Sequence, residues 1–126
     1  MIASAFNNPA QPAPGDMLAR VDDIPDAGAI VRDFQNGEAR FSVLLARKDG
    51  VVTAYENRCP HAGFPLERPD GRMIVLEGKY LFCAGHGAMF TIESGACVGG
   101  PGTGKGLTPL PVDIVDGDVR VSSRAA

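Results

Sequence analysis

The sequence is organised around two short stretches, Cys59-Pro60-His61 and Cys83-Ala84-Gly85-His86. We call them box 1 and box 2. The whole chain contains two histidines, and each lies within three residues of a cysteine in one of the boxes. Thiolate and imidazole groups are the common protein ligands of zinc and iron. Their concentration in two places predicts that both boxes contribute to one metal centre.

The ligand set suits either a tetrahedral zinc ion or an iron-sulfur cluster. Zinc sites usually pair like ligands within one arm, whereas each box carries one cysteine and one histidine. That arrangement is what a two-iron cluster needs when both thiolates bind one iron and both imidazoles bind the other. The sequence therefore favours a [2Fe-2S] cluster and leaves a zinc-stabilised interaction module as the alternative.

Regular turn signals surround the boxes. Four Asn-Gly or Asp-Gly pairs occur, at Asn36-Gly37, Asp49-Gly50, Asp70-Gly71 and Asp116-Gly117. Such pairs tolerate the positive φ angles of tight hairpin turns, so they predict an antiparallel meander.

Short apolar, β-branched or alternating runs lie between these turns and predict strands. The expected strands are 17–21, one starting near Ala29, 41–46, 51–57, 73–76, 79–82, 89–92, 110–115 and 118–121. No window of 11 residues shows a helical period, so the predicted fold is all-β, a small antiparallel sandwich or barrel. Each box directly follows a predicted strand.

The length of 126 residues fits one domain. Residues 1–15 contain two asparagines, three prolines and one glycine without periodicity, which predicts a flexible tail, and residues 16–126 are expected to form the single domain. The net charge of -3 and the lack of a basic run argue against nucleic-acid binding. There is no apolar run of membrane-spanning length and no signal-like start, so we expect no membrane association and a cytoplasmic location.

The boxes and their flanks resemble the cluster-binding motifs of Rieske proteins, most of all the small Rieske ferredoxins. The resembling flanks are 62–66 after box 1 and Gly87, Phe90 and Gly95 after box 2. The resemblance covers roughly Met17 to Val121. It implies a Rieske fold with a cluster-binding subdomain made of two hairpin loops, and one Rieske-type [2Fe-2S] cluster.

Carried over by motif position, the resemblance assigns a role to each of the four ligands. Cys59 and Cys83 would hold the inner iron, and His61 and His86 the outer iron near the surface. Residues 100–102, Gly-Pro-Gly, resemble the proline-bearing loop that covers the cluster from a third side. We also expect Gly63, Gly85 and Gly87 to let the backbone approach the sulfur atoms closely.

The chain departs from the family pattern in three ways. Twenty-one residues separate His61 from Cys83, more than is common in Rieske ferredoxins, and we expect the excess to lengthen the hairpin within 68–82. High-potential relatives join the two loops by a disulfide, and no further cysteine lies near Leu66 or Ala84 to form it here. Ala88 and Phe90 stand where those relatives place serine and tyrosine hydroxyls. Without these donors the reduced cluster is less stabilised, which predicts a low reduction potential.

The function implied is one-electron transfer by a low-potential Rieske ferredoxin, from a reductase to a terminal oxygenase that attacks an aromatic ring. The chain would be an electron-transfer component and not an enzyme, a monomer in isolation with transient redox partners. The alternative is a small Rieske subunit of a nitrite reductase-like enzyme, stably bound to a large partner. Phe64 and Met89 are candidate docking contacts, and Cys97 is expected to be a buried, unreactive thiol.

Overall fold

The computed structural model describes residues 8–60, 65–85, 87–100 and 105–123. Within these ranges the chain forms ten β-strands and one short 3-10 helix, η1 (Val21–Asp23). The prediction of an all-β fold is therefore confirmed.

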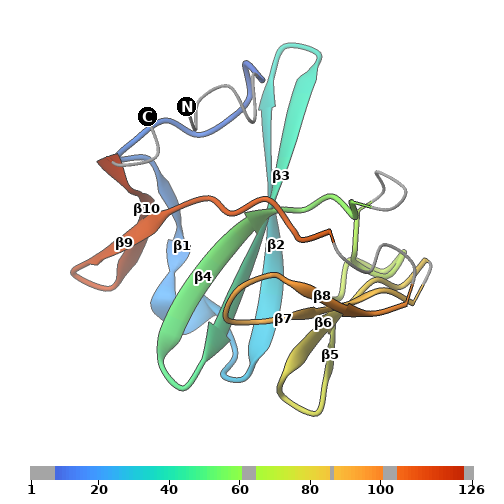
Figure 1. Cartoon of the computed structure of the whole chain (residues 1–126). Coiled ribbons are helices and arrows are strands. Elements are labelled where there is room, and N and C mark those ends of the chain that lie inside the picture. The colour runs from blue at the N-terminus through green and yellow to red at the C-terminus, as the bar shows by residue number, and fades with distance from the viewer. Residues whose placement is uncertain (1–7, 61–64, 86, 101–104, 124–126) are drawn as a thin grey trace.

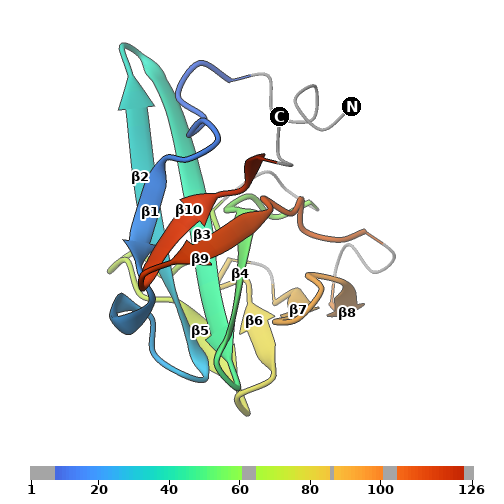
Figure 2. The same ribbon diagram turned by 90° about the vertical axis from the view of Figure 1, so that its left-hand side faces the viewer.

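The strands form three antiparallel sheets (Figure 1). The first has the order β1 (Met17–Arg20), β10 (Asp118–Val121), β9 (Val112–Val115). The central sheet has the order β2 (Gly28–Asn36), β3 (Ala39–Lys48), β4 (Val51–Glu56). The third has the order β5 (Ile74–Leu76), β6 (Tyr80–Phe82), β7 (Met89–Thr91), β8 (Cys97–Gly99). Figure 2, seen from the side of the first sheet, shows its strands crossing in front of β2 and β3.

Three of the four predicted Asn-Gly and Asp-Gly turns connect paired strands. Asn36-Gly37 joins β2 to β3, Asp49-Gly50 joins β3 to β4, and Asp116-Gly117 joins β9 to β10. In the second and third of these turns both residues have positive φ, for example 52° and 80° at Asp49-Gly50. This backbone matches the twist of the flanking strands, which is why these dipeptides predicted the hairpins correctly.

The fourth pair, Asp70-Gly71, does not join paired strands. It lies in a separate turn over 68–72, closed by the Arg68 N-H to Arg72 C=O hydrogen bond at 2.8 Å. The hairpin that follows, β5 to β6, turns at Glu77-Gly78 and has strands of only three residues. The short hairpin turned at Glu77-Gly78 agrees with the strands predicted at 73–76 and 79–82, while part of the extra length between the boxes forms the separate turn over 68–72.

Strand β3 is buried on both faces. Val43 and Leu45 belong to a first core, while Leu44 and Ala46, which point to the opposite face, belong to a second core. The first core also contains residues of β1 and β10. The second contains residues of β6 and β7 together with Cys59 and Cys83. The central sheet therefore separates a purely structural core from one that holds the predicted thiolate ligands.

Two segments differ from the expectations. Residues 8–15, part of the predicted tail, contact the domain: Ala10 is buried in the first core and the Gly15 N-H donates to the Val121 C=O at 2.8 Å. Strand β8 was not predicted, because its three residues carry no alternation. Its Cys97 is half-buried, packs against the second core, and its thiol lies 3.4 Å from the Gly99 C=O.

A carboxylate on β10, the middle strand of the first sheet, links this strand to the edge strand β1. Asp118 forms ion pairs with Arg20 of β1 and with Arg120. The hydrogen bonds that the two arginines donate to the carboxylate lower the pKa of Asp118, and the bond from Arg20 has the larger effect. A lowered folded-state pKa stabilises the fold above the unfolded-chain value of about 3.9, and this stabilisation is lost as the pH falls through the folded value.

We therefore expect Asp118→Asn to lower the free energy of unfolding at neutral pH by a modest amount, since both arginines are largely solvent-exposed. The difference from wild type should shrink as the pH falls below the unfolded-chain value of about 3.9 and the carboxylate becomes protonated. Urea unfolding followed by circular dichroism across this range measures it. A difference that stayed constant, or grew in acid, would contradict the assignment.

Candidate metal centre

Box 1 begins where β4 leaves the central sheet. The Glu56 N-H donates to the Thr108 C=O at 2.8 Å and the Asn57 N-H to the Ser42 C=O at 2.8 Å, so the end of β4 is held from both sides. Cys59 follows two residues later and is completely buried. The strand thus delivers the first predicted thiolate ligand into the second core, as the sequence indicated.

Box 2 lies in the hairpin loop between β6 and β7. Cys83 directly follows β6 and is also completely buried. Its N-H donates to the Ala88 C=O at 2.8 Å, and the Gly87 N-H donates to the Cys83 C=O at 2.9 Å. Gly87 has φ 78°, a left-handed conformation that glycine adopts without strain. The prediction that box 2 sits on a hairpin is confirmed.

The loop of box 1 is of a different kind. It connects β4 to β5, which belong to different sheets and do not pair with each other. The expectation of two hairpin loops therefore holds for box 2 and not for box 1. Alternating residues and turn signals identify strands but not the strands they pair with. The sequence therefore could not distinguish a hairpin loop, as in box 2, from a loop between two sheets, as in box 1.

The two loops contact each other. The Ala84 N-H, next to Cys83, donates to the C=O of Leu66, which lies just beyond box 1, at 3.0 Å. Leu66 is fully buried in the same core as Cys59 and Cys83. The structure therefore brings together the two cysteines that the sequence proposed as ligands of one centre.

The other predicted ligands, His61 and His86, lie outside the described residues. The same is true of Gly63, of the docking candidate Phe64 and of residues 101–102 in the predicted covering loop. Met89, the second docking candidate, is described and is half-buried on β7.

The start of the predicted covering loop packs tightly on box 2. Gly100 has φ 74°, and a Cβ there would lie 2.5 Å from the Gly87 carbonyl oxygen and 2.9 Å from the Ala88 Cα. Backbone therefore meets backbone, which only glycine permits. By contrast, a Cβ on Gly85 would meet no described atom within 4 Å, so the packing of the described protein atoms does not require glycine at that position.

The surroundings of the thiols fit a cluster of the predicted kind. Ala88 and Phe90, the two residues from which a low potential was predicted, are fully buried in the same core as the two cysteines. The two thiols are buried on adjoining loops and surrounded by apolar side chains. As soft ligands, they suit a soft metal centre. Such walls also exclude water from the inner side of the site.

Asn57 is a residue of this site that the sequence pattern did not predict. This buried amide hydrogen-bonds Ser42, Glu67 and Leu66 around the base of box 1. The available signal was an uncharged polar residue at the end of an apolar strand, two residues before a ligand. A pocket of about 480 Å³ opens beside it, between the end of the β2–β3 hairpin and the ends of the box 1 loop.

Among the helical segments that the structure describes, none is long and apolar enough to cross a membrane.

Comparison with known sequences gives a family match over most of the chain. The profile of the Rieske [2Fe-2S] domain matches residues 16–116. Apoptosis-inducing factor 3 of Homo sapiens and that of Mus musculus are each 35% identical over 78 residues. The match takes in 57% of this chain but only 12% of those much longer proteins.

Solved structures share the fold. The Sphingomonas yanoikuyae B1 ferredoxin superposes with a TM-score of 0.66 at 25% identity, covering 86% of this chain and 98% of that one. The ferredoxin of carbazole 1,9a-dioxygenase from Nocardioides aromaticivorans IC177 gives 0.67 at 19% identity, with 87% and 98% covered. The terminal oxygenase of the same system gives 0.70 at 21% identity, but this chain covers only 31% of it.

Proposed function

This chain belongs to the Rieske [2Fe-2S] domain family, and from that premise we propose that it is a ferredoxin carrying single electrons from a reductase to a terminal oxygenase. Its similarity to two ferredoxins, one of them the ferredoxin of carbazole 1,9a-dioxygenase, each covered to 98% of its length, supports a carrier and not a catalytic subunit. The observation that carries the proposal is the burial of Cys59 and Cys83 on two hydrogen-bonded loops of one core.

Cys59 and Cys83 are proposed to bind one iron of the cluster, and His61 and His86 the other. When bound, the cluster supplies a reversible one-electron couple. The chain's own contribution is to hold the two thiolates in position and to keep water away from them. Leu66, Leu81 and Phe90, all fully buried, form the apolar wall that does this.

The partners proposed are a reductase and an oxygenase, each bound transiently through a small surface by a monomeric carrier. The solved complex between the oxygenase and the ferredoxin of carbazole 1,9a-dioxygenase is an example of the proposed pairing with an oxygenase. We place the carrier in the cytoplasm. A stable complex with a large partner on size-exclusion chromatography of a native extract would instead support the nitrite reductase-like alternative.

Metal analysis with a visible spectrum tests the proposal most directly. Red-brown protein with two irons and two sulfides per chain is expected. The reduced protein should then be reoxidised by a ring-hydroxylating oxygenase in a stopped-flow experiment. Colourless protein with stoichiometric zinc would refute the proposal.

The reduction potential should lie at the low end of the Rieske range, nearer about -150 mV than +300 mV. Ala88 and Phe90 cannot donate the hydrogen bonds that would stabilise the reduced cluster. The potential should be constant between about pH 6 and 7 and fall only in alkali, because reduction raises the pKa of the coordinated imidazole N-H groups. Protein-film voltammetry measures both properties. A strongly positive midpoint, or a slope near neutral pH, would speak against a low-potential carrier.

A further inference from the structure

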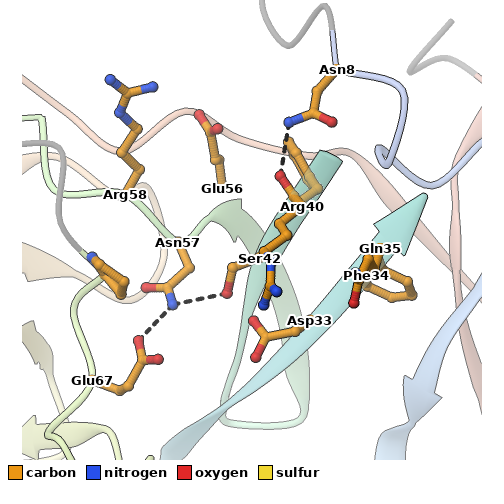
Figure 3. A pocket seen from close by; sticks show the side chains of 12 residues that line it. Asn8, Asp33, Phe34, Gln35, Arg40, Ser42, Glu56, Asn57, Arg58 and Glu67 are labelled. Atoms are coloured by element: carbon orange, nitrogen blue, oxygen red, sulfur yellow. Dashed lines mark hydrogen bonds between the residues drawn. The ribbon is translucent and has the colours of Figure 1, made fainter. Parts of the chain in front are cut away.

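We propose that Asn57 is the positioning residue that holds the two cluster loops in place relative to each other, a role that rests on the cluster-binding function proposed above. Asn57 is only 4% exposed. Its Nδ2 donates to the Ser42 Oγ at 3.1 Å and to the Glu67 Oε1 at 2.7 Å. In Figure 3 the Asn57 amide lies between these two side chains, which come from β3 and from the far side of box 1.

The first consequence is that one side chain fastens both ends of the box 1 loop. The chain leaves β4 at Asn57, passes through Cys59 and returns at Leu66. There the Leu66 N-H donates to the Asn57 Oδ1 at 3.0 Å, and Glu67 accepts from the Nδ2. Asn57 is itself fixed on β3 by its backbone N-H and by its side chain. The loop that carries box 1 is thereby anchored to the central sheet.

The second consequence is that the same contacts reach box 2. The Leu66 N-H donates to the Asn57 Oδ1, and the Leu66 C=O accepts a hydrogen bond from the Ala84 N-H at 3.0 Å. Ala84 follows Cys83, so the positions of Cys59 and Cys83 both depend on where Asn57 holds Leu66. A loose Leu66 would let the spacing of the two thiolates vary.

The hydrogen-bond pattern requires an amide at this position. Asn57 uses its NH₂ group as donor to Ser42 and Glu67 and its carbonyl oxygen as acceptor. An aspartate would keep the acceptor, lose the donors and set a second carboxylate against Glu67. The double variant Asn57→Asp/Glu67→Gln exchanges the amide and the carboxylate and preserves the net charge. The amide at position 67 can then donate to the carboxylate at position 57, the reverse of the wild-type hydrogen bond. The adjacent pocket gives the altered side chains room to adjust.

The test uses the purified wild-type chain, Asn57→Asp, the double variant Asn57→Asp/Glu67→Gln and two controls. The first control is Asn36→Ala, which removes an exposed amide that bonds the Pro9 C=O away from the boxes. The second is Ser42→Ala, which removes only one of the contacts made by Asn57. Two properties are measured: the rate at which a chelator removes the metal centre, followed by absorbance, and deuterium uptake in peptides that contain Leu66 and Ala84.

Asn57→Asp should release the centre about tenfold faster than wild type, as expected for the loss of a hydrogen bond to a charged group. Deuterium uptake should rise at Leu66 and Ala84 together. The double variant should return to within about threefold of wild type, Ser42→Ala should change the rate by less than about threefold, and Asn36→Ala should leave it unchanged. A merely structural Asn57 would not be rescued by the second substitution.

Unchanged release and uptake in Asn57→Asp, or no rescue by Glu67→Gln, would overturn the proposal. If Asn57→Asp does not fold, Glu67→Ala removes the same contact from the other side; it should also speed release and raise uptake at Leu66, and wild-type behaviour would again overturn the proposal. Deuterium uptake is compared between wild type and variants that carry the same metal, so the comparison can be made with either metal. A protein carrying zinc would thus refute the proposed function while the uptake still decides the role of Asn57.

Discussion

Cys83→Ala should yield a colourless protein without stoichiometric iron or sulfide. Cys83 is completely buried at the end of β6, with its backbone fixed by hydrogen bonds to Ala88 and Gly87. A cluster that loses one of two thiolates on the same iron cannot be held at that iron. Because a bound metal centre stabilises the folded state, the variant should also melt at a lower temperature than the cluster-loaded wild type.

Cys97→Ala is the matched control. Cys97 lies on β8 beside the same core but is half-buried and outside both boxes. This variant should keep two irons, two sulfides and the wild-type spectrum. Iron retained in Cys83→Ala would exclude Cys83 as a ligand. Iron lost in Cys97→Ala would mean that the wrong thiol had been assigned.

Gly100→Ala should be the most destabilising single-methyl addition among the described glycines with positive φ. Two costs combine at this position. A non-glycine residue at φ 74° costs about 1–2 kcal/mol. The new Cβ would also meet the Gly87 carbonyl oxygen at 2.5 Å and the Ala88 Cα at 2.9 Å, and overpacking against backbone typically adds about 1–3 kcal/mol.

Gly37→Ala separates the two costs. Gly37 has a similar φ of 62°, but a Cβ there meets nothing within 4 Å. Denaturant unfolding should therefore show a loss of about 1–2 kcal/mol for Gly37→Ala and of about 2–5 kcal/mol for Gly100→Ala. The Gly100 variant should in addition lose its cluster faster, because the displaced backbone belongs to the box 2 loop. Equal losses of stability in both variants would show that the covering loop can move away from box 2.

The local features of the fold could be predicted from the sequence. Asn-Gly and Asp-Gly pairs identified three hairpins, and the predicted ends of two strands near Cys59 and Cys83 agree with the ends of β4 and β6. These signals are short-range, because the type of a turn and the alternation of apolar and polar residues in a strand are determined by a few neighbouring residues.

What could not be predicted depends on contacts between distant segments. The box 1 loop connects two different sheets, and the burial of Ala10 needs a surface formed by β1, β3 and β10. The role of Asn57 depends on Ser42 and Glu67, 15 and 10 residues away in the chain. No local pattern marks such partners, since they are specified by the tertiary structure alone.

The double burial of β3 has a consequence for cooperativity. Leu44 and Leu45 are neighbours in the chain, yet each is fully buried in a different core. Sliding β3 by one residue would exchange the two sets of side chains, so both cores enforce the same register. Because β3 contributes side chains to both cores, we expect that neither core unfolds while the other remains folded. The domain should therefore unfold as a single cooperative unit, in which the core that contains Cys59 and Cys83 unfolds together with the core on the other face of β3.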